Sequence, residues 1–424
     1  MIKQRNPKKK WIYGFSDFET VKSRLLGEGK EPRNILGGKG LGLMEMTQLG
    51  LPVPQGIIVT TEACNSYLEN DEQLDDEIWI QIKEALLALE EATGKKLGDP
   101  RNPLLVSCRS GARTSMPGMM DTVLNIGLNS EVIGGLEETV SNPAFVYNSY
   151  RRLIQMFGSV VMGIDDEPFE EILSATRQNA GVSTDTELTA EQWRLICRSF
   201  ESLYKQQTQQ SFPKDPLEQV RMAIEAVFKS WNSRRAIIYR NATGIPHDWG
   251  TAVNIVSMVF GNRDNQSATG VCFTRNPDSG EKCHYGDFLV NAQGEDVVAG
   301  IRNTLPINKL KSLFPKLFPF FDDICDRLEN HYKDMQDLEF TIEQGKLWIL
   351  QTRSGKRTPQ AALKIAVDMA NEGSISRQEA VRRVSPIQID SLLHPSFNLP
   401  SKANAVVAGK AFARGINASP GAAV

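Results

Sequence analysis

The sequence lacks the features that mark several classes of protein. Its six cysteines are scattered and form no Cys-x-x-Cys pair, which indicates neither a disulfide framework nor a zinc site. The four histidines, His247, His284, His331 and His394, lie in unrelated contexts that suggest no metal site or catalytic dyad. No apolar run approaches the ~18 residues needed to span a bilayer, and the N-terminus has no apolar secretory segment. We therefore predict reduced thiols, no membrane partner and a cytoplasmic location.

The sequence also has no large excess of one charge, because 48 Lys and Arg nearly balance 51 Asp and Glu, for a net charge of -3. This balance argues against a broad polyphosphate-binding surface and so against nucleic acid as a partner, although a local basic cluster could still bind a small anion. The content of 41% hydrophobic and 23% charged residues is ordinary for a globular enzyme. With domains of ~150 residues, 424 residues predict two or three domains or subdomains.

The order of apolar patterns predicts a mixed α/β protein. Strands are expected at 56–60 and 104–110, with a long amphipathic helix at 78–92. Helical spacing then dominates 142–213, where Thr189 and Gln192 form a capping-box pair, and another helix follows Pro216. Strands return at 251–260, 270–274 and 288–291. After Arg353 two further helices are expected, the first closed by Gly373 and the second opened by a capping box at 376–379.

Two stretches in the first part could bind an anion. The glycine-rich segment 36–42 contains Lys39, and glycines let backbone N–H groups approach a phosphate while the lysine supplies charge. It is not a Walker A loop, and the alternative is a tight structural turn before a helix at 43–49. Arg109 lies inside an apolar strand and needs an anionic partner if that strand is buried, with an internal salt bridge as the alternative to a ligand.

The most informative stretch, 337–353, predicts a β-hairpin with its turn at Gln344 and Gly345. A two-residue loop would set Glu339 opposite Leu350, whereas a three-residue loop that includes Lys346 sets Glu339 opposite Gln351. The three-residue loop also sets Asp337 opposite Arg353. It groups the apolar residues on one face, namely Leu338, Phe340, Ile342, Trp348 and Leu350. We therefore predict an odd-numbered turn.

This register gathers two carboxylates, an amide oxygen and an arginine on one patch. Oxygen ligands suit Mg²⁺, and an adjacent cation suits phosphate. The alternative is a solvated hairpin face with cross-strand ion pairs.

The chain resembles the nucleotide-binding region of the pyruvate, phosphate dikinase family from about Trp11 onward. The resemblance is carried by four stretches: LLVSCRSGARTSMPGMMDT at 104–122, ATGVCFTRNP at 268–277, NAQGEDVVAG at 291–300, and DMQDLEFTIEQGKLWILQTRSGKRT at 334–358. The methionine-containing loop and the QTRSGKRT ending are more similar to this family than to phosphoenolpyruvate synthase and the rifampin phosphotransferases.

The resemblance implies an ATP-grasp fold and a division into six segments. These are a first ATP-grasp subdomain at 1–128, a helical insertion at 129–216, a return to the first subdomain at 217–260, a second subdomain at 261–356, a helical connector at 357–404, and the start of a swivelling phosphohistidine domain at 405–424.

The resemblance also implies roles for particular residues. Lys39 and Arg109 would contact the phosphates of ATP, Glu339 and Gln351 would hold Mg²⁺, and Arg353 would bind phosphate. Asp337 would support this site. Further nucleotide contacts are implied for Gln293, Glu295 and Met258. Such a module needs no catalytic base, because positioning and charge neutralisation by Mg²⁺, Lys and Arg are what in-line phosphoryl transfer requires.

The implied activity is transfer of the terminal pyrophosphoryl group of ATP to a histidine of a following domain, supplied in cis or in trans. The sequence carries no Thr-Ser-His-Ala-Ala motif of that domain, so we expect the chain to support only the ATP half-reaction. The resemblance leaves room for a homodimer of the full-length protein. The alternatives are a non-catalytic nucleotide-binding or partner-binding module, and a related dikinase such as phosphoenolpyruvate synthase.

Overall fold

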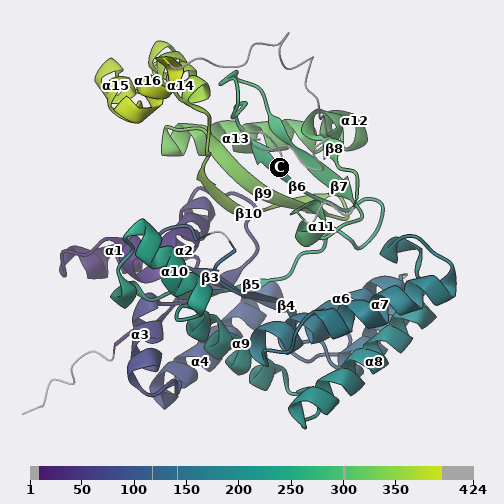
Figure 1. Ribbon diagram of the computed structural model, residues 1–424. Coiled ribbons are helices and arrows are strands. Elements are labelled where there is room, and N and C mark those ends of the chain that lie inside the picture. Colours follow the sequence, from purple (N-terminus) through teal and green to yellow (C-terminus); the bar gives the residue numbers. More distant parts are fainter. Residues whose placement is uncertain (1–8, 117, 141, 299–301, 394–424) are drawn as a thin grey trace, which may run out of the picture. The chain divides into compact units, whose positions relative to one another are not determined.

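The computed structural model describes residues 9–116, 118–140, 142–298 and 302–393, and they form two compact units (Figure 1). Unit 1 comprises Met1–Met258 and unit 2 comprises Val259–Val424. The expected mixed α/β fold is confirmed, with one antiparallel five-stranded sheet in each unit. The finer division into six segments stays a prediction, and its last segment lies outside the described residues. No helix in the described ranges is long and apolar enough to cross a membrane.

The sheet of unit 1 has the strand order β1-β2-β5-β3-β4. Its strands are β1 (Ile12–Gly14), β2 (Gly56–Val59), β3 (Val106–Gly111), β4 (Thr122–Ile126) and β5 (Ala252–Ser257). Strands β2, β3 and β5 all fall within or beside the ranges predicted from their apolar runs. The central strand β5 is therefore contributed by the part of the chain that follows the helical segment, and it pairs with β2 and β3 from the part before it.

Helices surround this sheet and begin and end where the sequence gives capping signals. The first four are α1 (Phe18–Leu26), α2 (Pro32–Gln48), α3 (Thr61–Glu69) and α4 (Asp76–Thr93). Helix α4, expected at 78–92, starts where Asp75 accepts a hydrogen bond from Glu77 N–H and ends at Gly94 in the left-handed conformation.

Helix α5 (Ser130–Thr139) precedes the stretch 142–213 that was predicted to be helical, and that stretch contains α6 (Pro143–Met156), α7 (Glu167–Ala180) and α8 (Ala190–Thr208). The capping box of Thr189 and Gln192 at the start of α8 is confirmed. Helices α6, α7 and α8 lie side by side (Figure 1), and α9 (Pro216–Ser230) and α10 (Arg234–Thr243) follow before β5.

Unit 2 has the strand order β10-β9-β6-β7-β8. Its strands are β6 (Ala268–Phe273), β7 (Tyr285–Val290), β8 (Leu305–Pro306), β9 (Gln336–Glu343) and β10 (Lys346–Ser354), and its helices are α11 (Gly294–Val298), α12 (Leu310–Leu313), α13 (Phe318–Tyr332), α14 (Pro359–Asn371), α15 (Arg377–Arg383) and α16 (Pro386–Leu393). The helices expected after Arg353 are therefore present, and Ser376 caps α15 by accepting from Glu379 N–H.

Helix α13 covers one face of the unit 2 sheet. Its buried Phe321 contacts Phe340 of β9 edge-to-face, with ring centroids 5.0 Å apart. One fully buried charge ties this layer to the next helix: the guanidinium of Arg275, just after β6, bonds Glu329 of α13 at 2.6 Å and Glu372 after α14 at 2.7 Å. Burial opposes the charge, but these hydrogen bonds outweigh it and raise the pKa of Arg275. The other face carries polar residues of β9 and β10 and an apolar cluster in which Leu289 of β7 packs with Val297 of α11.

Candidate functional site

The hairpin of β9 and β10 confirms the predicted pairing but not the predicted turn. Glu339 lies opposite Gln351 and Asp337 opposite Arg353. The loop nevertheless has two residues, Gln344 and Gly345, with φ of 48° and 76°, the left-handed values that a tight hairpin turn requires. The expected odd-numbered turn is wrong. A β-bulge between Ile349 and Gln351 inserts the extra residue instead, so that Leu350 has no partner in the ladder.

The bulge also corrects the predicted apolar face. Before it, the buried residues of β10 are Leu347 and Ile349 rather than Trp348 and Leu350, which are only half-buried. Leu347 pairs with Ile342 and Ile349 with Phe340, so these residues complete the core under α13. An odd-numbered turn would shift every residue of β10 before the bulge by one position. The prediction therefore assigned Trp348 and Leu350 to the face that Leu347 and Ile349 occupy.

The four hairpin residues form two adjacent polar pairs on the opposite face. Arg353 donates through Nε to Asp337 Oδ2 at 2.7 Å, and Gln351 donates through Nε2 to Glu339 Oε1 at 3.1 Å. The Asp337 side chain is 9% exposed, whereas that of Arg353 is 48% exposed. Burial raises the pKa of Asp337, and the attraction of Arg353 offsets this only in part. The patch therefore holds a carboxylate that is ionised at a cost.

A further acid, Asp287, lies in the row of paired residues that crosses the sheet through Glu339, and the sequence did not predict it. Glu339 pairs with Val271 of β6, and Val271 pairs with Asp287 of β7, so that Asp287 lies on the same face of the sheet. Asp287 is 3% exposed. An acid in the middle of the apolar strand at 285–290 was the signal that could have identified it.

Gln293 and Glu295 lie at the start of the short helix α11, which packs on β6 and β7. Gln293 is buried, and its Nε2 donates to Asn262 Oδ1 at 3.3 Å. Its Oε1 is a buried acceptor with no hydrogen-bond partner among the described residues. An unmet buried amide oxygen costs about 1–3 kcal/mol, a cost that a hydrogen-bond donor placed beside Gln293 would relieve.

In unit 1 the expected glycine loop is the kinked beginning of helix α2. Gly37 has φ 68° and ψ 173° and separates two helical segments. Gly38 N–H donates to Ala112 O at 2.9 Å, and an added Cβ at Gly37 would lie 1.7 Å from Gly111 O. The glycines thus let the helix approach β3, and the segment lies within a kinked helix that begins at Pro32, not in a tight turn before a helix at 43–49. Lys39 is half-buried in the segment that follows the kink.

Arg109 lies on the sheet face that α2 covers. It pairs with Asn254 of β5, whose Nδ2 donates to Arg109 O at 3.2 Å. An added Cβ at Gly40 would lie 2.8 Å from Asn254 Oδ1, so the segment around Lys39 packs beside the partner of Arg109. Lys39 therefore lies in the helix segment that packs on the sheet face of Asn254 and Arg109. Arg109 itself is only half-buried.

The methionine-containing segment after β3 is irregular, as predicted, and packs against α10 and the end of α9. Met116 belongs to a buried cluster with Trp231 and Ala236. The Cζ atom of Arg113 lies 5.0 Å from the centroid of the Trp249 ring. Met258, expected in the strand, directly follows the end of β5, and its N–H donates to Leu105 O at 2.8 Å. It is half-buried. The segment and Met258 are thus held by different contacts.

Comparison with known proteins agrees with this arrangement of motifs. The chain matches the family described as "Pyruvate phosphate dikinase, AMP/ATP-binding domain" over residues 33–84, 71–312 and 319–374. It is 50% identical over 415 residues to the pyruvate, phosphate dikinase of Clostridium symbiosum, which covers 98% of this chain and 46% of that protein.

Two further relatives give the same result. The pyruvate, phosphate dikinase of Rhizobium meliloti is 50% identical over 426 residues, covering 98% of this chain and 46% of the relative. The chloroplastic enzyme of Mesembryanthemum crystallinum is 50% identical over 395 residues, covering 93% and 41%. The chain therefore spans less than half the length of these curated relatives. The matches over most of its length establish that it belongs to the pyruvate, phosphate dikinase family and comprises the AMP/ATP-binding domain of that family.

Proposed function

We propose that this chain binds ATP with Mg²⁺ and transfers the terminal pyrophosphoryl group of ATP to a histidine of a phosphohistidine domain, supplied in cis or in trans. The bond between the α- and β-phosphates breaks, AMP leaves, and a new bond forms between phosphorus and the histidine nitrogen. Orthophosphate would then accept one phosphoryl group to give pyrophosphate, and pyruvate would accept the other to give phosphoenolpyruvate. Family membership supports the first step most directly, because the matched domain is an AMP/ATP-binding domain.

The observation that carries the proposal is the polar hairpin face of unit 2. Glu339 and Gln351 adjoin the Asp337–Arg353 ion pair, and the combination offers oxygen ligands beside an exposed guanidinium. Carboxylate and amide oxygens are hard ligands of the kind Mg²⁺ selects, so these residues fit the ion. The amide of Gln351 now presents Nε2 to Glu339, so ligation through Oε1 requires rotation of the terminal amide.

Each residue type then has a definite task. Bound Mg²⁺ would neutralise part of the polyphosphate charge. Arg353, whose side chain is half exposed, would bind a phosphate oxygen, while the buried Asp337 carboxylate orients the guanidinium through their ion pair. Lys39 and Arg109 are the cations that we assign to the remaining phosphate oxygens, and Gln293, Glu295 and Met258 are proposed nucleotide contacts. No protein nucleophile is needed in this domain, because the attacking nitrogen belongs to the acceptor histidine.

The first test is calorimetric titration of the chain with ATP, with and without Mg²⁺. Wild-type protein should bind ATP saturably and only with Mg²⁺. Glu339→Ala and Lys39→Ala should each weaken binding by at least about tenfold, because each removes a direct contact to the ion or the phosphates. Glu343→Ala is the matched control in the same strand, since Glu343 pairs with Arg263 at 3.3 Å instead of joining the patch. Lys83→Ala, at an exposed position of α4, controls for Lys39.

The second test separates binding from transfer. The chain is mixed with a separately produced phosphohistidine domain and ATP labelled at the β-phosphate. Label on the histidine, together with release of AMP, is the expected result. ATP binding without label transfer would instead identify a non-catalytic nucleotide-binding module, and no ATP binding at millimolar nucleotide would overturn the proposal altogether.

A further inference from the structure

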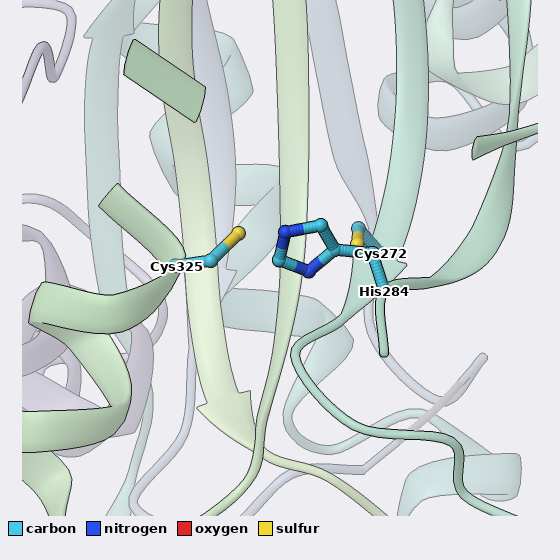
Figure 2. A group of neighbouring side chains, drawn as sticks. All are labelled: Cys272, His284 and Cys325. Atoms are coloured by element: carbon cyan, nitrogen blue, oxygen red, sulfur yellow. The ribbon is translucent and has the colours of Figure 1, made fainter. Parts of the chain in front are cut away.

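Two cysteines and a histidine that look unrelated in the sequence meet in unit 2. Cys272 lies in β6, His284 directly precedes β7, and Cys325 lies in α13. Their ligand atoms, two sulfurs and a ring nitrogen, all lie within 4.8 Å of one another. Figure 2 shows the imidazole with Cys325 on one side and Cys272 on the other. The expectation that no histidine belongs to a metal-ligand cluster is therefore wrong, because the cluster joins three elements distant in sequence.

Ordinary packing explains the two thiols, and Phe318 and Phe321 pack against the His284 ring, but packing does not account for the polar atoms of that ring. Cys272 and Cys325 are 0% and 1% exposed and act as small apolar residues between β6 and α13. The imidazole, however, is fixed by a 2.7 Å contact between its Nε2 and Asp322 Oδ1. Its Nδ1 is buried and has no hydrogen-bond partner among the described residues. A ring oriented by a carboxylate, with its second nitrogen unsatisfied, is the usual arrangement of a histidine metal ligand.

We propose that Cys272, His284 and Cys325 form a binding site for Zn²⁺. Two sulfurs and one imidazole nitrogen are the donors that Zn²⁺ prefers, and they are poor ligands for Mg²⁺ or Ca²⁺. The three residues leave a fourth position of a tetrahedral site for water. On binding, each thiol gives its proton to solvent and each sulfur forms one bond to the ion, so that two protons are released for one Zn²⁺ bound.

The site is separate from the polar hairpin face. Cys272 pairs with Leu338, and the next residue pair along the strands is Val271 with Glu339. Successive residues of a strand point to opposite faces, so the thiol faces α13 while Glu339 faces the other side of the sheet. Zn²⁺ bound here would join β6, the beginning of β7 and α13. Its role is therefore to stabilise unit 2, and it takes no part in the proposed phosphoryl transfer.

Proton release gives the site a defined pH dependence. Zn²⁺ displaces one proton from each thiol, so the apparent affinity should fall as the pH is lowered. The partly exposed His284 side chain, 19% accessible, provides the side from which the ion enters.

The experiment uses the full chain carrying Cys283→Ser, which removes the one exposed cysteine, next to His284. Co²⁺ serves as the spectroscopic probe for Zn²⁺. One equivalent should produce thiolate-to-cobalt charge-transfer absorption, and one equivalent of Zn²⁺ should abolish it. Zn²⁺ should also raise the temperature of the unit 2 unfolding transition. The charge-transfer signal tests thiolate ligation directly, without any substitution in the core.

Variants then assign the ligands. Cys272→Ser, Cys325→Ser and His284→Gln should each weaken metal binding by at least about tenfold, whereas Cys64→Ser, a buried cysteine of unit 1, should have no effect. His284→Gln is the variant best able to fold, and its ATP binding should equal that of the parent protein. Absence of charge-transfer absorption, or absorption of equal strength in the His284→Gln protein, would overturn the proposal.

Discussion

Unit 1 and unit 2 hold their candidate site residues in different ways. In unit 1 the segment that carries Lys39 packs on the sheet through glycines, most closely where the backbone of Gly37 meets that of Gly111. In unit 2 the site residues are side chains on a hairpin, and charged pairs hold the layers in place. A backbone contact tolerates no added atom, whereas a charged pair tolerates no lost partner. The two units should therefore fail under different substitutions.

The largest effect is expected at the buried charge of unit 2. Arg275→Met removes a guanidinium that bonds Glu329 and Glu372, and it leaves the 6% exposed Glu329 carboxylate without its counter-ion. We expect a loss of about 3–5 kcal/mol in the free energy of unfolding of unit 2. Differential scanning calorimetry should show this as a lowered transition for unit 2 with the transition of unit 1 unchanged.

Lys364→Met is the control for this prediction. Lys364 pairs with Asp368 at 2.7 Å on an exposed helix face, and such pairs contribute about 0–1 kcal/mol. If the two variants were equally stable, charge pairing would not be what holds the layers of unit 2 together.

The backbone contact of unit 1 comes next. Gly37→Ala places a Cβ 1.7 Å from Gly111 O at a φ of 68°, so the helix must move away from β3. We expect a cost of roughly 2–4 kcal/mol, from overpacking and from the strained backbone. Thermal unfolding should show the loss in unit 1.

Gly50 provides a matched control, because it has the same φ of 68° but no atom within 4 Å of an added Cβ. Gly50→Ala should cost only ~1–2 kcal/mol, the backbone term alone. Equal losses in the two variants would mean that the close approach to Gly111 contributes nothing.

How much of this could be predicted differs between the units for physical reasons. The pairing of Glu339 with Gln351 followed from the requirement that polar residues share a face. The location of the extra residue did not, since an odd turn and a two-residue turn with a bulge at Leu350 give the same final register. The glycines near Lys39 were ambiguous, because close approach to a phosphate and close approach to a strand require the same residue. The contact of Cys325 with Cys272 depends on how α13 packs, which no local pattern encodes.

Deletion of single residues from β10 sharpens the distinction between turn and bulge. Without Leu350 the ladder becomes regular, and Gln351 still lies opposite Glu339. We expect a stability loss of only ~1–2 kcal/mol and ATP affinity within about threefold of wild type. Deletion of Thr352 is the counterpart: it would move Arg353 opposite Leu338, on the buried face, and should weaken ATP binding by at least about tenfold. Calorimetric titration measures both, and loss of binding in the Leu350 deletion would show that the bulge itself shapes the site.

The smallest effect is the titration of the hairpin acid. The folded-state pKa of Asp337 is raised by burial, so ionising this group costs stability in the native protein. The stability that Asp337 contributes is present below its unfolded pKa of about 3.9 and is lost as pH rises through the folded value. Asp337→Asn does not titrate, so its stability relative to wild type should increase as the pH rises from about 4 toward neutrality.

Glu372→Gln provides the opposite sign. The hydrogen bond from Arg275 lowers the pKa of Glu372, so its stabilising contribution is present above the unfolded pKa and is lost as pH falls through the folded one. Unfolding free energies of the two variants, measured against wild type from acid to neutral pH, should therefore change in opposite directions. Parallel profiles would contradict the comparison, because the acid of the hairpin would then be stabilised by its partner as the acid beside Arg275 is. Opposite profiles mean that unit 2 carries one carboxylate for stability and, at a cost to stability, another where we propose that the magnesium nucleotide binds.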